Sequence, residues 1–303
     1  MIYTVTLNPS VDYIVKLEQF EFGSLNRMTD DSKFPGGKGI NVSRVMKRQG
    51  VESKAIGFLG GFTGAFIEDF LTAENINHQF IKVSGDTRIN IKLKTDVETE
   101  INGLGPSVSD EQLDQFLQQF EDMDHHDIVL LAGSIPGTLP SSIYKRIMDI
   151  CNEKEIKVVA DVSGEALKEV VSGKPFLIKP NHHELGELFD TKIETVEEAH
   201  VYAKKLVSQG VQHVIVSLAE KGALLVTEGN SFVANVPKGK VMNSVGAGDS
   251  VVGGFISAYS TNHPIEEAFK IGVASGSATA FSLELCTKEK MEELLPQIDI
   301  KTL

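Results

Sequence analysis

The sequence predicts a doubly wound α/β fold: a mostly parallel sheet with helices on both faces and a small inserted β-sheet. Short apolar runs of strand length alternate with amphipathic stretches of helical length along most of the 303 residues. These runs are continuously apolar, as in buried parallel strands, because both faces of such a sheet are covered. Two other segments alternate polar and apolar residues, which is typical of strands with one covered face.

The expected elements of the main sheet follow one another along the whole chain. The strands are expected at residues 2–7, 55–59, 128–132, 157–161, 176–179 and 213–218. The helices between them are expected at residues 39–48, 109–121, 140–152 and 196–209. This order predicts a single domain that spans residues 1–303.

The alternating segments cover residues 11–17 and 88–94, and another strand is expected at 98–101. We expect them to form a small antiparallel sheet that acts as a lid, built from segments near 11–18, 27–34 and 87–102. Its expected place is beside the carboxyl ends of the main strands, where open α/β sheets bind ligands.

Composition excludes several classes of function. Lys and Arg total 29 and Asp and Glu total 42, so the net charge of −13 offers no basic field to nucleic acid or to an anionic membrane. The apolar run at 128–132 is too short to span a bilayer, and the N-terminus lacks the form of a secretion signal. Two cysteines, Cys151 and Cys286, are too few for a disulfide framework. A soluble cytoplasmic protein is expected.

A glycine-rich turn at residues 245–250 precedes an apolar helix expected at 251–259. Small residues at a helix start let backbone N–H groups face a bound anion, which the positive end of the helix also favours. Asp249 lies in the first turn of that helix. It is either a catalytic carboxylate beside the anion or a simple helix cap.

A second glycine turn, Pro35-Gly36-Gly37-Lys38-Gly39-Ile40-Asn41-Val42, also opens a helix. It is either a tight turn with a solvated lysine or a cradle for a sugar phosphate, in which Asn41 donates hydrogen bonds and Lys38 supplies charge. The turn lacks the Ser or Thr of a P-loop after Lys38. The turn at 245–250 lacks the third glycine of the dinucleotide-binding pattern.

Together these segments resemble the paired signatures of the ribokinase-like carbohydrate kinases. The stretches at 6–12, 132–136 and 179–184 resemble the sugar-phosphate branch of that family, and the matches run in family order from residue 3 to about residue 282. Within the branch, Thr87-Arg88-Ile89-Asn90-Ile91-Lys92-Leu93 is most similar to the kinases that act on fructose 1-phosphate.

The resemblance implies the catalytic roles. Asp249 would be the general base that accepts the proton of the attacking hydroxyl group. The backbone N–H groups of Gly246, Ala247 and Gly248 would stabilise the transferred γ-phosphoryl group of ATP. Transfer would be direct and in line, without a phosphoenzyme.

The resemblance also implies a set of substrate contacts. Arg27 and Arg88 would face the substrate phosphate, because guanidinium groups offer paired N–H donors. Without the resemblance, each would be interpreted as a solvated strand residue. The full set of implied sugar-phosphate residues is Asp12, Arg27, Gly37, Lys38, Asn41, Arg88, Asn90 and Ser134.

On the nucleotide side, the resemblance places Lys179 and Asn181 near the ATP phosphates and makes Glu184 the acid that organises Mg²⁺. Otherwise Asn181 would be a helix N-cap and Glu184 a first-turn acid. The adjacent His182 and His183 are interpreted as solvated side chains rather than metal ligands. The implied nucleotide-binding set is completed by Ser217, Leu218, Ala219, Glu220, Lys221 and Gly222, with Gly248 and Asp249.

One position of that nucleotide loop departs from the family pattern. Ala219 stands where the family usually has glycine. The added methyl group is tolerable if Ala219 has a negative φ. A close approach of its backbone to ATP is less certain than in the family.

The expected activity is therefore the ATP- and Mg²⁺-dependent phosphorylation of fructose 1-phosphate to fructose 1,6-bisphosphate. Tagatose 6-phosphate and fructose 6-phosphate are the alternative substrates, and a non-catalytic sugar-phosphate sensor is the alternative from another class. A requirement for a monovalent cation and allosteric regulation are left open. The partners are small molecules, together with a second copy of the chain.

The expected homodimer follows from the faces of the strand at 88–94. Ile89, Ile91 and Leu93 share one face, and Arg88, Asn90, Lys92 and Lys94 share the other. If the polar face of this strand covers the substrate, its apolar face projects away from the α/β core. The apolar face can then pair with the same face of a second chain. The resemblance to the sugar-phosphate kinases implies the same pairing of lids.

Overall fold

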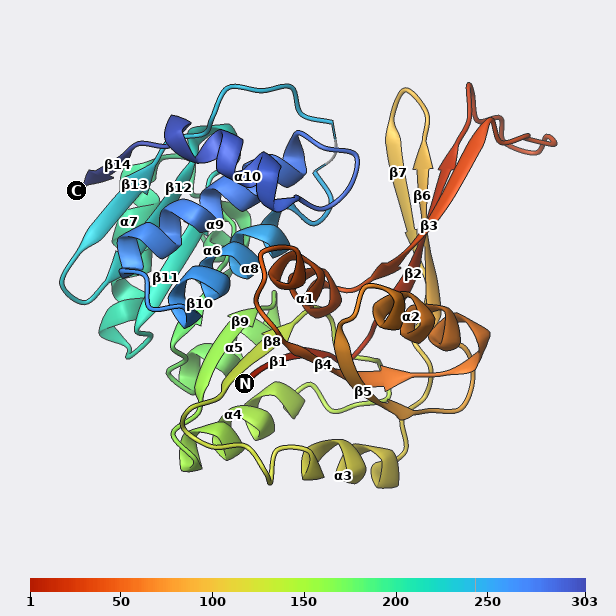
Figure 1. Cartoon of the computed structure of the whole chain (residues 1–303), viewed down its shortest axis with the longest axis horizontal. Coiled ribbons are helices and arrows are strands. Elements are labelled where there is room, and N and C mark those ends of the chain that lie inside the picture. Colours follow the sequence, from red (N-terminus) through yellow and green to blue (C-terminus); the bar gives the residue numbers. More distant parts are fainter. Residues whose placement is uncertain (243) are drawn as a thin grey trace.

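A computed structural model describes residues 1–242 and 244–303 of the chain (Figure 1). Its large sheet has ten strands in the order β14-β13-β12-β11-β10-β9-β8-β1-β4-β5. The parallel strands are β1 (Ile2–Thr6), β4 (Lys54–Leu59), β5 (Asn77–Lys82), β8 (Ile128–Ala132), β9 (Lys157–Asp161), β10 (Leu177–Ile178) and β11 (His213–Ser217). An antiparallel edge follows, formed by β12 (Ala223–Thr227), β13 (Ser231–Ala234) and β14 (Ile300–Thr302). The predicted mostly parallel sheet is confirmed.

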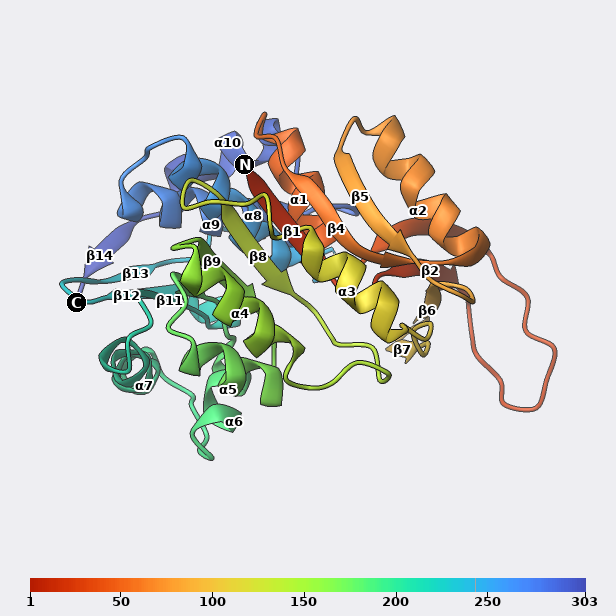
Figure 2. The ribbon, with the colours of Figure 1, turned by 90° about the horizontal axis from the view of Figure 1, so that it is seen from below.

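Helices cover both faces of this sheet (Figures 1 and 2). One core layer packs the sheet against α3 (Asp110–Gln118), α4 (Ile143–Glu153), α5 (Glu165–Ser172), α6 (His182–Leu188) and α7 (Val196–Ser208). The opposite layers pack it against α1 (Lys38–Arg48), α2 (Gly61–Ala73), α8 (Ala247–Ser260), α9 (Ile265–Ala280) and α10 (Lys288–Leu294). The doubly wound class is therefore also confirmed.

The predicted elements are present with small shifts at their ends. The strands at 128–132 and 157–161 have the predicted bounds, whereas β10 keeps only two of its four predicted residues. The helix predicted at 251–259 begins earlier, at Ala247, because Gly246 adopts a left-handed conformation with φ 76 that starts the helix. As a result, Gly248 and Asp249 both lie in the first helical turn.

A second sheet of four strands projects from the carboxyl edge of the large one. Its order is β3 (Asp30–Gly36), β2 (Ser10–Lys16), β6 (Arg88–Lys94) and β7 (Glu98–Asn102). The predicted small second sheet is confirmed, but the prediction that it is purely antiparallel is wrong. β2 and β6 are parallel, because both leave the same edge of the large sheet and run outward, and they place Asp12 opposite Asn90.

This topology brings distant segments to one edge of the molecule. The parallel strands all end at the edge from which the small sheet rises, and α1 and α8 begin there (Figure 1). None of the described helices is long and apolar enough to cross a lipid bilayer.

Candidate active site

A cavity of about 460 Å³ lies where β1, β8 and β9 end and the small sheet begins. Asn41 and Asp249, which are 208 residues apart in sequence, meet in it. Most of the residues expected to bind the sugar phosphate or catalyse the transfer line it, namely Asp12, Gly37, Lys38, Asn41, Arg88, Asn90, Ser134, Gly246 and Asp249.

Asp249 has the environment expected of a general base. Its side chain is 7% exposed, and its Oδ2 accepts a hydrogen bond of 2.8 Å from the Asn41 amide. Burial, with a further contribution from Asp161, raises the pKa of Asp249 to about 6, although Asn41, Lys38 and Lys179 act in the opposite direction. A carboxylate with this pKa is ionised at neutral pH and is a stronger proton acceptor than an ordinary aspartate.

The start of α8 provides the neighbouring anion site. The N–H group of Ala247, the first residue of α8, already donates to the Ser244 carbonyl oxygen at 3.3 Å. The next N–H groups in the first turn of a helix have no acceptor within the helix, so those of Gly248 and Asp249 are the ones available to a phosphoryl group. Gly248 also lets a cation approach, because a Cβ at this position would lie 3.1 Å from Nζ of Lys179. The helix start and Lys179 thus converge beside Asp249.

Asp161 organises the two lysines of the site. Its Oδ1 accepts a hydrogen bond of 2.9 Å from Lys38, and its Oδ2 forms an ion pair of 3.4 Å with Lys179. Asp161 is 1% exposed; burial works against its charge, but Lys179 and Lys38 together hold its pKa below the ordinary value. Asp161 likewise keeps Lys38 protonated, because it is the largest contributor among the carboxylates that raise the pKa of Lys38.

The sequence analysis missed Asp161. The available signal was its position, because it is the last residue of an apolar strand and such residues lie at the ligand-binding edge of a parallel sheet. The same rule points to Asn8, which follows β1 and also lines the cavity.

The small sheet presents its polar face to the cavity. Asn90 donates hydrogen bonds to Ser10 Oγ at 3.0 Å and to Asp12 Oδ1 at 3.2 Å. Ser10 Oγ in turn donates to the same oxygen of Asp12 at 2.8 Å. Asp12 is therefore held in one orientation, as a positioned acceptor for a substrate hydroxyl group must be.

Arg88 lies at the base of that face. Its Nη2 donates to the Asn8 carbonyl oxygen at 3.0 Å, whereas its buried Nε has no hydrogen-bond partner. The buried Thr6 Oγ1 and Asn8 Oδ1 are also unpaired. Buried polar atoms without partners are costly, so three of them around one cavity indicate a polar ligand.

Arg27 is not brought to this cavity, contrary to the expectation from the sequence. It is exposed in the connection between β2 and β3, which extends away from the body of the molecule (Figure 1). Arg27 lies outside both alternating segments, 11–17 and 88–94, so alternation could not determine where Arg27 points.

Asn181 and Glu184 form the capping box of α6. Asn181 Oδ1 accepts from the backbone N–H groups of His183 and Glu184, at 2.8 and 2.9 Å. Glu184 Oε2 accepts from the Asn181 N–H at 2.8 Å. The helix-cap interpretation of these residues therefore holds; roles toward ATP and Mg²⁺ stay predictions.

The Glu184 site is compatible with a magnesium ion. Glu184 raises the pKa of Lys38, so its carboxylate lies within electrostatic range of the cavity. The hydrogen bond of the helix cap uses Oε2 of Glu184, which leaves Oε1 as the oxygen that could bind a metal ion. Mg²⁺ favours oxygen ligands and usually keeps several of its waters, so one carboxylate oxygen at the carboxyl edge of the sheet fits it.

The remaining nucleotide residues lie farther along the same edge. β11 ends at Ser217, which forms a β-bridge with Asn181, and none of residues 217–222 lines the cavity described above. The condition for an unstrained methyl group at Ala219, a negative φ, is not met, because its φ is 52. The loop keeps the backbone geometry that suits glycine, and alanine adopts it at a cost of about 1–2 kcal/mol.

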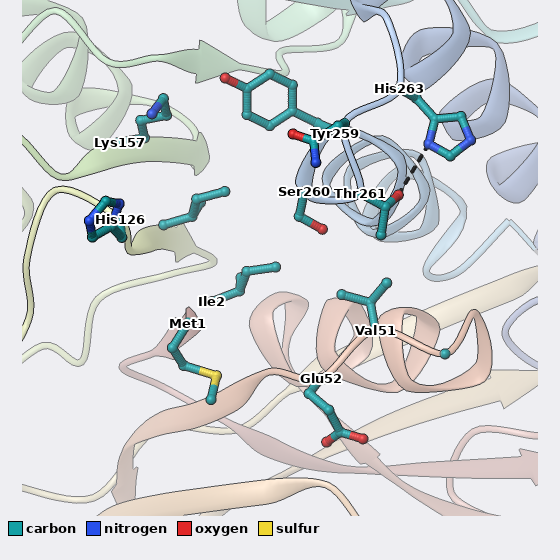
Figure 3. A pocket seen from close by; sticks show the side chains of 13 residues that line it. Met1, Ile2, Val51, Glu52, His126, Lys157, Tyr259, Ser260, Thr261 and His263 are labelled. Carbon is teal, nitrogen blue, oxygen red and sulfur yellow. Dashed lines mark hydrogen bonds between the residues drawn. The ribbon is translucent and has the colours of Figure 1, made fainter.

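A larger cavity of about 720 Å³ lies at the opposite, amino edge of the large sheet (Figure 3). Its lining includes Ile2, Glu52, Lys157 and Tyr259, and it contains neither glycine turn nor Asp249. The cavity at the carboxyl edge is therefore the candidate active site, although it is the smaller of the two.

The family comparison agrees with this geometry, because the pfkB family of carbohydrate kinases matches residues 5–291. The chain belongs to this family. A 1-phosphofructokinase of Bacillus subtilis is 60% identical over 303 residues, which cover 100% of both chains. A tagatose-6-phosphate kinase of Staphylococcus epidermidis is 34% identical over 310 aligned positions, covering 99% of each chain. Escherichia coli phosphofructokinase-2, solved with substrates and products, superimposes with a TM-score of 0.93 at 28% identity, covering 97% of this chain and 98% of that one.

A pfkB family kinase transfers a phosphoryl group to a carbohydrate hydroxyl, and this cavity contains the groups which that reaction needs. Its lining combines a buried carboxylate of raised pKa, a helix start and Lys38, and Asp161 links Lys38 to Lys179. The polar face of the small sheet adds a guanidinium group from Arg88 on β6 and a fixed carboxylate from Asp12 on β2.

Proposed function

We propose that this pfkB family kinase is a 1-phosphofructokinase, which converts ATP and fructose 1-phosphate into ADP and fructose 1,6-bisphosphate. The 60% identity with the Bacillus subtilis enzyme over the full chain carries the proposal. The lower identity of the tagatose-6-phosphate kinase, 34%, disfavours that alternative. We place the enzyme in the cytoplasm, in keeping with its two free, buried cysteines.

In the proposed mechanism, Asp249 removes the proton from the C6 hydroxyl group of fructose 1-phosphate. The C6 oxygen then forms a bond with the γ-phosphorus of ATP, and the bond between that phosphorus and the β,γ-bridging oxygen breaks. ADP leaves with the bridging oxygen. The start of α8, Lys38 and Lys179 stabilise the charge on the transferred group. Mg²⁺, organised by Glu184, would neutralise charge on the ATP phosphate oxygens.

The substrate orientation follows from the two sides of the cavity. Arg88, with its unpaired Nε, binds the C1 phosphate at the base of the small sheet. Asp12 accepts a hydrogen bond from a ring hydroxyl group. The C6 hydroxyl then points toward Asp249 and the start of α8.

An acceptor assay tests the proposed function directly. ADP release is measured with fructose 1-phosphate, fructose 6-phosphate and tagatose 6-phosphate at equal concentrations. We expect kcat/KM to be highest for fructose 1-phosphate. A higher value for tagatose 6-phosphate would contradict the proposed substrate, and saturable binding of a sugar phosphate without ADP release would favour a sensor.

Arg88→Ala is expected to raise the KM for fructose 1-phosphate about 10- to 100-fold, while the KM for ATP changes little. The variant removes one charge-assisted contact to phosphate, worth about 1.5–3 kcal/mol. Lys94→Ala is the matched control on the same face of β6, since it removes only a loose ion pair of 3.9 Å with Glu98. Equal increases in both KM values for Arg88→Ala would instead indicate a structural role.

We also propose that two chains pair through the apolar face of the small sheet. On this face Ile89 is 40% exposed. Ile101, which lies opposite Ile91 on the neighbouring strand β7, is 56% exposed. The connection between β2 and β3 exposes Phe22 and Leu25 as well. Part of the face is already covered within one chain, because Val11 joins the core beside α2 and Leu93 packs on Val15.

Ile101→Asp is therefore expected to convert the dimer into a monomer, because burying an unpaired carboxylate in an apolar interface is costly. Light scattering across a dilution series measures the mass. Val201→Asp is the matched control, since Val201 is 53% exposed on the distant α7. A wild-type protein that is monomeric at every concentration would contradict the proposed dimer.

A further inference from the structure

A tight turn before β8 holds three side chains with metal-binding atoms on the surface. Asp124, His125 and His126 are exposed, and their potential ligand atoms all lie within 4.8 Å of one another. They form the one such group of three or more residues in the part of the chain that the structure describes.

Backbone hydrogen bonds fix this turn. The Asp127 N–H donates to the Asp124 carbonyl oxygen at 2.9 Å and closes a β-turn with the two histidines at its centre. The Asp124 N–H donates to Asp127 Oδ2 at 3.0 Å. The other oxygen of the Asp127 carboxylate accepts from the Met1 ammonium group at 2.6 Å. The turn is thus tied both to itself and to the start of β1.

The carboxylate of the group is also oriented. Asp124 Oδ1 accepts the His126 N–H at 2.8 Å, which leaves Oδ2 available as a ligand. The rings of His125 and His126 have centroids 3.9 Å apart, so both imidazoles lie on one side of the turn. Zn²⁺ binds ligands at about 2.0–2.2 Å, so the three ligand atoms need only approach to about 3.3 Å from one another. Exposed side chains make that change by small rotations.

We propose that Asp124, His125 and His126 bind a divalent transition-metal ion, with Zn²⁺ or Ni²⁺ as the preferred class. Two imidazole nitrogens and one carboxylate oxygen favour such ions over Mg²⁺, which favours sets of oxygen ligands. Three protein ligands leave the remaining coordination positions to water or to a small anion.

The position of the turn separates this site from the kinase reaction. It lies at the amino end of β8, whereas Ser134 follows the carboxyl end, and five residues of strand separate the two edges by about 16 Å. His126 lines the cavity of about 720 Å³, and Figure 3 shows it on the same side of that cavity as Lys157. An anion bound to the metal ion would therefore have a cationic side chain nearby.

A second histidine pair provides a comparison within the chain. The rings of His182 and His183 are also 3.9 Å apart. The nearest acid in sequence, Glu184, uses one oxygen for the α6 cap, and these histidines belong to no group of potential metal ligands among the described residues. The spacing of the rings is thus equal in the two pairs. Only the first pair has a carboxylate oxygen within 4.8 Å of a ligand atom of both histidines, among the described residues.

Equilibrium dialysis of the full chain against ZnCl₂ tests the proposal. Excess Mg²⁺ is present and nucleotide is absent, so that the oxygen ligands of the kinase site are occupied. We expect one Zn²⁺ per chain, about tenfold weaker binding for Asp124→Asn, and loss of the site in His125→Gln/His126→Gln. The control His182→Gln/His183→Gln should keep the wild-type stoichiometry and affinity.

Co²⁺ provides a second readout, because its visible absorption reports the ligand geometry. The wild-type spectrum should change on binding, and the change should be absent from the His125→Gln/His126→Gln variant. No saturable Zn²⁺ binding by the wild type would overturn the proposal. So would unchanged binding by that variant, or loss of binding in the His182→Gln/His183→Gln control.

Discussion

Asp249→Asn is expected to lower kcat about 10²- to 10⁴-fold while KM values for both substrates stay close to those of the wild type. The asparagine keeps the size of the side chain and an oxygen that can accept the Asn41 hydrogen bond, but it cannot accept a proton. Steady-state kinetics and binding of fructose 1-phosphate measure the two effects separately. Turnover near the wild-type level with intact binding would show that Asp249 only positions the substrate.

The raised pKa of Asp249 gives this prediction a pH dependence. Because the base must be ionised, kcat/KM of the wild type should fall below pH 6, where Asp249 of the free enzyme becomes protonated. The residual activity of Asp249→Asn should lack this acid limb. If Asp249→Asn showed the same loss of activity in acid, the group that titrates would be one other than Asp249.

Stability should change in the opposite direction from activity. A carboxyl group whose folded-state pKa is raised favours folding while it is protonated, and this contribution is lost as the pH rises through about 6. Asp249→Asn removes the cost of ionising a buried group, so its free energy of unfolding above pH 6 should exceed that of the wild type by about 1–3 kcal/mol. Urea unfolding at pH 5 and pH 8 measures the difference, which should be largest at pH 8.

Asp161→Asn is expected to destabilise the protein by about 3–5 kcal/mol at neutral pH. The change leaves the buried Lys179 and the half-exposed Lys38 without their shared counter-ion. Removing one partner of a buried ion pair leaves an uncompensated buried charge, and this costs more free energy than the intact pair contributes to stability. The pKa of Asp161 is lowered in the folded state, so its contribution is present at neutral pH and is lost as acid protonates the carboxylate. The two proteins should therefore become similar in stability in strong acid.

Asp149→Asn provides the control for this stability measurement. It removes an exposed ion pair of 2.9 Å with Lys145 on α4 and is expected to cost less than about 0.5 kcal/mol. A similar small loss for Asp161→Asn would mean that water replaces the carboxylate between the lysines.

Asp161→Asn also separates a positioning role from a merely structural one. Asp161 raises the pKa of Asp249, and the two lysines lower it. Without Asp161, the fall of kcat/KM in acid should move to lower pH, because Asp249 loses a repelling charge and faces both lysines. If Asp161→Asn is active and its activity falls at the same pH as that of the wild type, the coupling between the two aspartates is contradicted.

The local geometry of the site could be predicted from local sequence, whereas the roles of its residues came from the family resemblance. Both glycine turns open helices, and Asp249 lies in a first helical turn, because short-range backbone geometry determines where small residues and helix starts occur. Alternation along 88–94 assigned Arg88 and Asn90 to one face, and both line the cavity. Neither result required knowledge of distant contacts.

Pairing between strands was decided only by the tertiary structure. The parallel contact between β2 and β6 arises because the intervening β4, α2 and β5 return the chain to the same edge of the large sheet. The alternation of polar and apolar residues contains no information about that path. The exposed position of Arg27 was likewise decided by the tertiary structure, because the family resemblance that implied a substrate contact does not describe how the connection between β2 and β3 extends.

The sequence by itself determined the fold class and the glycine turns, because each depends on periodicity or local backbone conformation, and its motifs identified Asp249 as the candidate base through the family resemblance. Only the tertiary structure brought Asp161 to Lys38 and Lys179 and supplied the burial that raises the pKa of Asp249. The physical reason is that the charge state of a buried group depends on its desolvation and on its neighbours across the fold, and neither of these is a property of the segment that contains it.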